Sequence, residues 1–244
     1  MRIKAKVAYD GTAYGGWQVQ KNANTVQAEM ERAYERITGI HAHIQCAGRT
    51  DAGVHALGQT VHFDIETTIP PHKLPFVFNT HLPHDIRMLE ACEAAPDFHA
   101  CYCAAGKCYE YNIWNAPHEN PLLRRTSMHV PVPLQEENMR AVAAVLTGTH
   151  DFAAFCAAGA QVKTTVRTVS SIEIRRCGNL ITLSVCGTGF LYNMVRIIAG
   201  TLILAGEGKY TPEQAEQALN TRLRKYAGFT AEPNGLILKE VYYE

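Results

Sequence analysis

Long hydrophobic runs and a net charge are both missing from this 244-residue chain. Its first residues contain no apolar run that could serve as the core of a signal peptide. The most apolar stretch, FLYNMVRIIAGTLILAG, is interrupted by Asn193 and Arg196, so we expect no membrane span and a cytoplasmic location. Because 23 basic and 23 acidic side chains cancel, the chain does not coat nucleic acid by bulk charge, although a local basic cleft remains compatible with this composition.

The sequence also lacks cysteines and histidines at the spacing that metal sites require. The chain has 8 cysteines and 11 histidines, and FHACYCAAGKCYEY gathers His99, Cys101, Cys103 and Cys108. This stretch has no CxxC pair and no second pair of ligands at zinc-site spacing, and no HExxH occurs elsewhere. We therefore predict no metal. Since nothing indicates secretion, we expect the cysteines to be reduced thiols.

Hydrophobic periodicity predicts alternating strands and amphipathic helices. The first part reads as a strand at 3–11, a helix at 24–39 capped by Asn24 and ended by Gly39, two strands around a loop at 41–65, and a connector with a short helix. The second part reads as a strand at 105–114, a helix at 134–148, a hairpin at 166–187, a helix from Phe190, a helix capped by Thr211, and a strand at 235–243. We predict an α+β fold of two similar halves, 1–104 and 105–244, that share a mainly antiparallel sheet with a central cleft.

Asp51 is the leading candidate for catalysis. It lies in CAGRTDAGVHALGQ, between two expected strands, where Gly48 and Gly53 permit backbone angles that other residues resist. Such a loop can hold a carboxylate close to a substrate. The alternative is a turn aspartate that bonds its own backbone.

Arg196 favours the catalytic interpretation. It lies in GTGFLYNMVRIIAGTL, a predicted helix that is apolar nearly all round and therefore buried. A buried arginine keeps its charge and needs a carboxylate of the fold or an anionic ligand, unless its stem carries the guanidinium to the surface. Paired with Asp51, it would keep that carboxylate ionised, which suits a nucleophile.

Tyr109 is a candidate for contact with an unpaired base. On the expected strand it shares a face with Lys107 and Tyr111, because side chains alternate with a period of two. Aromatic rings interleaved with basic side chains form a platform on which a base can stack. An ordinary half-buried strand gives the same alternation.

Four blocks of this sequence resemble the tRNA pseudouridine synthase A family in order and spacing. They are AYDGTAYGGWQVQ, GRTDAGVHALGQ, GTGFLYNMVRIIAGTL and AGFTAEPNGLILKEVYY, and the resemblance runs from residue 3 to residue 243. It implies the pseudouridine synthase fold and a homodimer that binds tRNA. It also implies isomerisation of uridine to pseudouridine in the anticodon stem-loop, at tRNA positions 38–40, without cofactor or metal.

The resemblance also implies a role for individual residues. Asp51 would be the catalytic nucleophile and Arg196 its ion-pair partner. Tyr109 would stack on the target uracil, Arg49 would help to flip or hold the nucleotide, and Leu236 would line the pocket.

The sequence departs from the family pattern around these residues. Cys108 and Glu110 stand where relatives often carry basic residues, Thr188 replaces a commoner asparagine, and Phe229 and Glu232 stand where proline is usual. Two other functions compete with the enzyme. One is a tRNA-binding or tRNA-folding protein on the same scaffold with little catalysis, and the other is a metal-dependent hydrolase built on the histidines.

Overall fold

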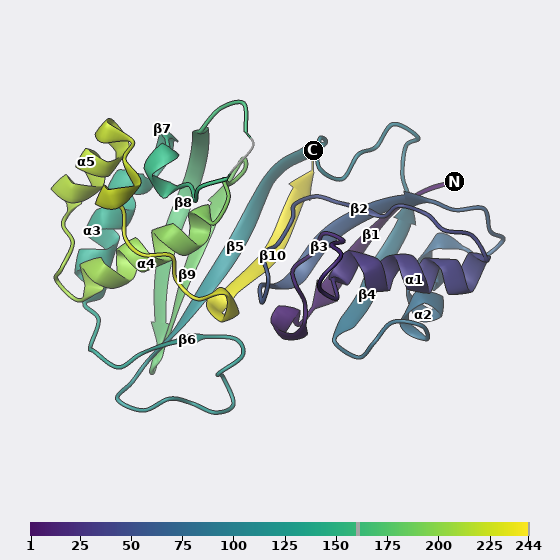
Figure 1. The fold of residues 1–244 in the computed structure, drawn as a ribbon, viewed down its shortest axis with the longest axis horizontal. Helices are drawn as coiled ribbons and strands as arrows, with labels where there is room; N and C mark the ends of the chain where they lie inside the picture. The colour runs from purple at the N-terminus through teal and green to yellow at the C-terminus, as the bar shows by residue number, and fades with distance from the viewer. Residues whose placement is uncertain (160–161, 244) are drawn as a thin grey trace. The chain divides into compact units, whose positions relative to one another are not determined.

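The chain forms two compact units in a computed structural model that describes residues 1–159 and 162–243 (Figure 1). Met1–Ala105 and Leu238–Glu244 make up the first unit, and Gly106–Ile237 makes up the second. The boundaries fall within strands β5 (Ala104–Asn115) and β10 (Leu236–Tyr243). The α+β class is confirmed, and the strand pairs are mostly antiparallel.

The first unit is an open sheet in the order β4-β1-β3-β10, with β2 paired to β3. Its other strands are β1 (Arg2–Tyr9), β2 (Gln45–Cys46), β3 (His55–Asp64) and β4 (Ile86–Glu93). Its helices are α1 (Val26–Thr38) and α2 (Leu74–Asn79), with short 3-10 turns η1 (Gly11–Ala13) and η2 (Pro71–Lys73). β1 runs antiparallel to β3 and to β4, and Val7 lies opposite Gln59 and Met88.

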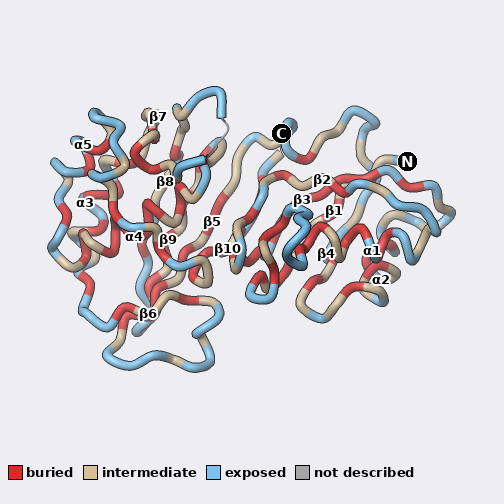
Figure 2. The backbone as a smooth tube through the Cα atoms, viewed as in Figure 1, coloured by how far each residue is buried: buried red, intermediate tan, exposed pale blue. Residues whose placement is uncertain are grey.

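The helices of the first unit pack against one face of this sheet. Burial alternates along β1, where Ile3 and Val7 are fully buried and their neighbours are not (Figure 2). Tyr34 of α1 meets Phe63 of β3 edge to face, with ring centroids 5.8 Å apart, and Phe78 of α2 lies 5.4 Å from the same ring. A strand with one covered face produces this alternation of apolar and polar residues.

The N-terminal cap of α1 is Thr25, so the prediction of Asn24 is wrong by one residue. Thr25 Oγ1 accepts a hydrogen bond from the Ala28 N–H at 3.4 Å. The Asn24 side chain instead donates to Glu29 and accepts from Arg32, at 2.8 Å each. Both residue types cap helices well, so composition alone does not decide between neighbours. Gly39 ends the helix in the left-handed conformation, as predicted.

The second unit is an open sheet in the order β5-β9-β8-β7, with β6 parallel to β5. Its further strands are β6 (Met128–Val130), β7 (Gly148–Asp151), β8 (Val166–Cys177) and β9 (Leu180–Gly187). Its helices are α3 (Glu136–Leu146), α4 (Met194–Gly206) and α5 (Pro212–Thr221), with short turns η3 (Ala153–Phe155), η4 (Arg224–Tyr226) and η5 (Pro233–Gly235). The predicted hairpin is confirmed as β8 and β9, joined through Gly178 at φ +59°.

Helix α4 begins at Met194 and not at Phe190, where the sequence predicted its start. Asn193 adopts the left-handed conformation, with φ 58°, and the helix follows it. Asparagine tolerates this conformation better than most residues, so it can stand at such a boundary. Arg196 consequently lies in the first turn of α4, and most of the helix is buried as predicted. Within the described part of the chain, no helix is long and apolar enough to cross a membrane.

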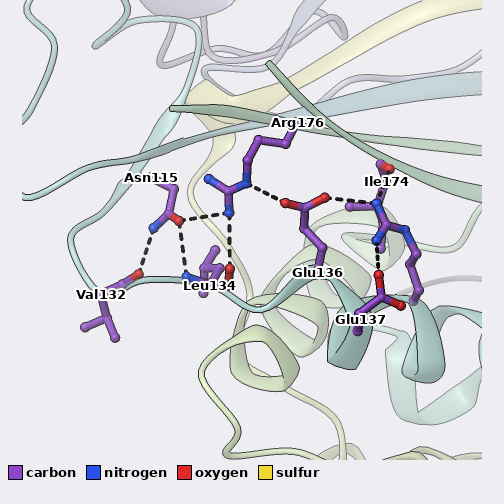
Figure 3. A network of polar contacts seen from close by, with 8 residues as sticks. Asn115, Val132, Leu134, Glu136, Glu137, Ile174 and Arg176 are labelled. Atoms are coloured by element: carbon purple, nitrogen blue, oxygen red, sulfur yellow. Dashed lines mark hydrogen bonds and ion pairs between the residues drawn. The ribbon is translucent and has the colours of Figure 1, made fainter. Parts of the chain in front are cut away.

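A polar network ties α3 to the sheet of the second unit (Figure 3). Arg176 of β8 donates from Nε to Glu136 at 2.5 Å, and from Nη2 to the Leu134 carbonyl at 3.1 Å and to Asn115 Oδ1 at 3.2 Å. Asn115, the last residue of β5, in turn donates to the Val132 carbonyl at 2.7 Å. One guanidinium thus fixes the start of a helix, the end of a strand and the loop between them.

Glu136→Gln should lower the free energy of unfolding by about 1 kcal/mol at neutral pH. The hydrogen bond from Arg176, with a second from Arg140, holds the pKa of Glu136 below its ordinary value of 4.5. Because the folded-state pKa is lowered, this stabilisation is present above the ordinary value and disappears as the pH falls through the folded-state pKa. Denaturant titrations near neutrality and near pH 3 should show the difference between variant and wild type shrinking in acid.

Glu137→Gln is the matched control for this prediction. Glu137 also pairs with Arg140, but its side chain is 89% exposed. Its substitution should change stability by only a few tenths of a kcal/mol. An equal loss of stability in the two variants would show that the network adds nothing beyond a surface ion pair.

Candidate active site

The loop that joins β2 to β3 carries Arg49 and Asp51 in the first unit. Arg49 is exposed and Asp51 is partly exposed. The Val54 N–H donates to the Asp51 carbonyl at 3.1 Å, which closes a turn. Gly53 lies within that turn at φ +77°, so the glycine is required for the backbone geometry that the sequence suggested.

The segment 9–17 fastens this loop on both sides of Asp51. On one side, the Thr50 hydroxyl bonds the Tyr9 hydroxyl at 2.8 Å, and the Thr50 carbonyl accepts from the Trp17 N–H at 3.0 Å. On the other side, the Gly53 N–H donates to the Tyr14 carbonyl at 3.2 Å. The residues that flank Asp51 are therefore held by side-chain and main-chain bonds.

Two glycines of this segment lie against the loop backbone. A Cβ at Gly11 would fall 1.9 Å from the Val54 carbonyl oxygen, and a Cβ at Gly16, which has φ +95°, would fall 2.6 Å from the Thr50 carbonyl oxygen. Any larger residue at either position would push the two segments apart. The block AYDGTAYGGWQ is thus the structural support of the Asp51 loop.

The two tyrosines of this support are buried. Burial raises the pKa of Tyr9 well above its usual value, and burial with a hydrogen bond to Asp85 does the same for Tyr14. The Tyr14 hydroxyl donates to Asp85 at 2.6 Å. Both phenols therefore remain protonated at neutral pH and serve as hydrogen-bonding groups of the scaffold, without taking up charge.

Arg196 is held in the second unit by acceptors on two sides of its guanidinium. Nε donates to the Ala231 carbonyl at 2.7 Å, and Nη1 donates to Asn193 Oδ1 at 2.9 Å. The Ala231 N–H returns a bond to the Arg196 carbonyl at 3.1 Å. These hydrogen bonds fix the orientation of the planar guanidinium.

The segment that holds Arg196 packs tightly on the next turn of α4. A Cβ at Gly200 would fall 2.0 Å from the Phe229 carbonyl oxygen. The Gly228 N–H donates to Thr201 Oγ1 at 2.9 Å. These contacts place Ala231 beside Arg196.

Tyr109 lies on β5 and is 7% exposed. Its ring meets Phe190 edge to face at a centroid distance of 5.3 Å and an interplanar angle of 89°. This contact fixes the ring plane, because edge-to-face pairs are favoured by the aromatic quadrupole. Tyr109 is thus a rigid aromatic group at the edge of the loop that precedes α4.

Cys108 forms a disulfide with Cys186, so the expectation that all cysteines are reduced thiols is wrong for this pair. The two residues lie directly opposite each other in the β5–β9 register, with Cα atoms 4.1 Å apart and a sequence separation of 78. Only the strand pairing brings them together, which is why their spacing along the chain did not reveal it. Among the described residues, no three His, Cys, Asp or Glu side chains gather as a metal site.

Leu236 begins β10, directly after the η5 turn, and is 6% exposed. A Cβ at Gly235 would fall 2.7 Å from the Tyr111 ring, and the Tyr111 hydroxyl donates to the Glu232 carbonyl at 2.8 Å. Burial, and then the nearby Glu232 carboxylate, raises the pKa of Tyr111, so it too remains protonated. The second unit therefore holds Tyr109, Arg196 and Leu236, and the first unit holds Arg49 and Asp51.

Sequence reasoning missed the residues that support Asp51. Tyr9, Gly11, Thr50 and His55 each bond or closely approach the other segment. Tyr9 and Gly11 belong to AYDGTAYGGWQVQ, whereas Thr50 and His55 belong to GRTDAGVHALGQ. The only indication in the sequence that these blocks act together was that both contribute to the same family resemblance. Neither composition nor periodicity shows that the two blocks touch.

Comparisons with known proteins give a consistent result along the chain. The family model described as tRNA pseudouridine synthase matches residues 5–103 and 142–244. A tRNA pseudouridine synthase A from Acetivibrio thermocellus is 45% identical over 99% of this chain and 99% of its own length. Proteins of the same name from Shouchella clausii and Bacillus pumilus are 46% and 43% identical, over 99% and 100% of this chain and 93% and 100% of their own lengths.

Proposed function

Because the chain belongs to the tRNA pseudouridine synthase family, we propose that Asp51 is the nucleophile with which it isomerises uridine to pseudouridine in the anticodon stem-loop of tRNA. The observation that carries the assignment is the support of the Asp51 loop. Thr50 and Gly53, on either side of the carboxylate, are bonded to Tyr9, Trp17 and Tyr14. A reacting group gains most from such pre-organisation.

The reaction defines what the carboxylate must do. The bond between C1′ of the ribose and N1 of uracil breaks, the base rotates while it stays bound, and C1′ bonds to C5. The hydrogen on C5 is lost and N1 gains one, so the product is an isomer of the substrate. An ionised carboxylate serves either by attack on C1′ or by removal of a proton from the sugar. Both routes require the base to leave its stack.

Arg196 would pair with Asp51 in the active enzyme and keep its carboxylate ionised. The support for this role is the fixed guanidinium, which donates from Nε to Ala231 and from Nη1 to Asn193. A guanidinium presents its donors in a rigid planar fork, a geometry that suits a carboxylate partner.

The remaining residues would handle the flipped nucleotide. Tyr109, held by Phe190, would stack on the uracil, and Leu236 would line the pocket around it. Arg49 is exposed and would bind phosphate or occupy the space that the flipped base leaves. We also propose a cytoplasmic homodimer that binds tRNA as its partner.

Arg196→Lys should lower turnover by about 10-fold to 100-fold. A lysine presents its three donors from a single nitrogen, so it cannot reproduce the planar fork whose separate nitrogens bond Ala231 and Asn193 and fix the orientation of the group. Single-turnover rates with saturating enzyme would measure the effect. Arg140→Lys, on the exposed surface of α3, is the matched control and should retain the wild-type rate. Equal rates in the two variants would remove Arg196 from the mechanism.

The test of the function is tritium release from tRNA labelled at uracil C5. Pseudouridine formation expels that hydrogen when C5 bonds to the sugar, whereas binding or hydrolysis elsewhere leaves it in place. We expect release from the wild-type protein together with one pseudouridine per tritium lost. Tight tRNA binding without release would instead indicate a tRNA-binding or tRNA-folding protein. Mapping the product nucleotide in the tRNA tests the anticodon stem-loop assignment separately.

A further inference from the structure

His55 is a buried side chain beside the Asp51 loop that the proposed mechanism does not use. It is the first residue of β3 and is 4% exposed. Its Nδ1 accepts a hydrogen bond from the Gly11 N–H at 3.0 Å. Histidine is uncommon among fully buried residues unless its ring nitrogens are bonded.

Nδ1 of His55 acts as a hydrogen-bond acceptor in this arrangement. The Gly11 N–H is a fixed donor that points at Nδ1, so Nδ1 must present its lone pair. Asp10 Oδ1 lies 3.1 Å from the same nitrogen, but it accepts from the Thr12 N–H at 3.0 Å and from the Thr12 hydroxyl at 2.5 Å. We assign the Nδ1 bond to Gly11, because Asp10 Oδ1 already accepts two hydrogen bonds from Thr12.

Nε2 of His55 is buried and has no hydrogen-bond partner among the described residues. A buried N–H without a partner is unfavourable, and a leucine of similar volume would avoid it. The acceptor at Nδ1 therefore must contribute something that an apolar side chain does not. The position of Gly11 beside the Asp51 loop indicates what this hydrogen bond contributes.

The hydrogen bond that Gly11 donates to His55 fixes Gly11 directly against the Asp51 loop. The Cα of Gly11 lies so close to Val54 that a Cβ would fall 1.9 Å from the Val54 carbonyl oxygen. The same loop is bonded at Thr50 and Gly53 to the segment that follows Gly11. A shift of η1 would therefore be passed on to the backbone that carries Asp51.

We propose that His55 is a positioning residue of the catalytic loop. It accepts the hydrogen bond from the Gly11 N–H and thereby holds η1 against the backbone of the loop that carries Asp51. The proposal rests on the proposed function, because it is Asp51 that is positioned. It assigns to His55 no contact with RNA and no proton transfer.

His62 provides a matched control in the same strand. It is 3% exposed, and its Nδ1 accepts a backbone N–H, that of Ala100, at 3.1 Å. Burial lowers the pKa of His62 to about 4, so its ring is neutral at pH 7. The two histidines thus make the same kind of bond, but His62 makes it far along β3 from the loop.

The experiment compares the steady-state kcat and KM of four variants, using tritium release. His55→Leu should lower kcat by about 10-fold to 100-fold with a smaller change in KM, because the loop that it positions carries the reacting carboxylate. His55→Asn should recover most of kcat, since its Oδ1 replaces Nδ1, whereas His55→Gln, whose acceptor lies near the Nε2 position, should not. His62→Leu should retain the wild-type kcat.

Amide hydrogen exchange gives a readout that does not need activity. Peptides that cover 47–54 should exchange faster in His55→Leu than in wild type, and should be unchanged in His62→Leu. A His55→Leu protein with wild-type kcat and wild-type exchange would overturn the proposal, as would a His55→Asn protein as slow as the glutamine variant. If the wild-type protein released no tritium, the function would fail, and the exchange data would still decide whether His55 orders the loop.

Discussion

An Asp51→Asn protein should release no tritium from C5-labelled tRNA while it binds the same tRNA with nearly wild-type affinity. Asparagine keeps the shape of the side chain and its acceptor oxygen but is neither a nucleophile nor a base. Removal of a nucleophile typically costs about 10⁴-fold or more in kcat. The loop backbone should keep its conformation, because it is held through Thr50 and Gly53 and not through the Asp51 side chain alone.

Asp64→Asn is the control for this substitution. Asp64 ends β3 in the same unit and pairs with Arg2 at 2.8 Å, with a side chain that is 65% exposed. Its loss should leave turnover unchanged. Residual release by Asp51→Asn at more than about one thousandth of the wild-type rate would argue against a nucleophilic or basic role for Asp51. Loss of tRNA binding in the same variant would point to a role in recognition.

Gly200→Ala should destabilise the protein and lower turnover together. In an ordinary helix this change adds up to about 1 kcal/mol of stability. Here the new Cβ would lie 2.0 Å from the Phe229 carbonyl oxygen, so the segment must move off α4. We expect a loss of about 2 to 3 kcal/mol in the free energy of unfolding, as in overpacked cores. Turnover should fall about 100-fold, because Ala231 of this segment orients Arg196.

Gly208→Ala separates the steric effect from the loss of a glycine. Gly208 follows the end of α4 at φ +73°, and no atom of the described residues other than its chain neighbours lies within 4 Å of the position that a Cβ would take. Its substitution should cost about 1 kcal/mol through backbone strain and leave the rate per folded molecule unchanged. Chemical denaturation and active-site titration would measure both quantities. A stable, fully active Gly200→Ala protein would show that the 227–232 segment does not position Arg196.

The sequence predicted most of the longer helices and strands in their order because their periodicity is local, but it did not predict β4, β6 or β7. The helix caps and starts were less certain, since they depend on single residues. Thr25 caps α1 although its neighbour Asn24 is an equally good cap by type. Asn193 delays the start of α4 by taking a left-handed conformation that hydrophobic periodicity does not register.

The sequence predicted the candidate reacting residues of the site, but it did not predict the residues that hold them in place. A lone carboxylate among glycines and an arginine in an apolar helix are visible in the sequence. The bonds of His55 to Gly11 and of Tyr9 to Thr50 join residues far apart in the chain. The Cys108–Cys186 disulfide depends in the same way on strand register, which a single sequence does not specify.

The discontinuity of the first unit has a consequence for synthesis on the ribosome. Residues 238–243 of β10 belong to this unit and lie next to β3, yet they are translated after the whole of the second unit. Until they emerge, the part of β3 that β2 does not cover has a strand edge with unpaired backbone groups, which is a template for aggregation. The Asp51 support can form early because segment 9–17 and β3 are both near the N-terminus, but the sheet that carries it is closed only by late residues. Prematurely terminated chains should therefore be substrates for chaperones and proteases and not partly active enzymes.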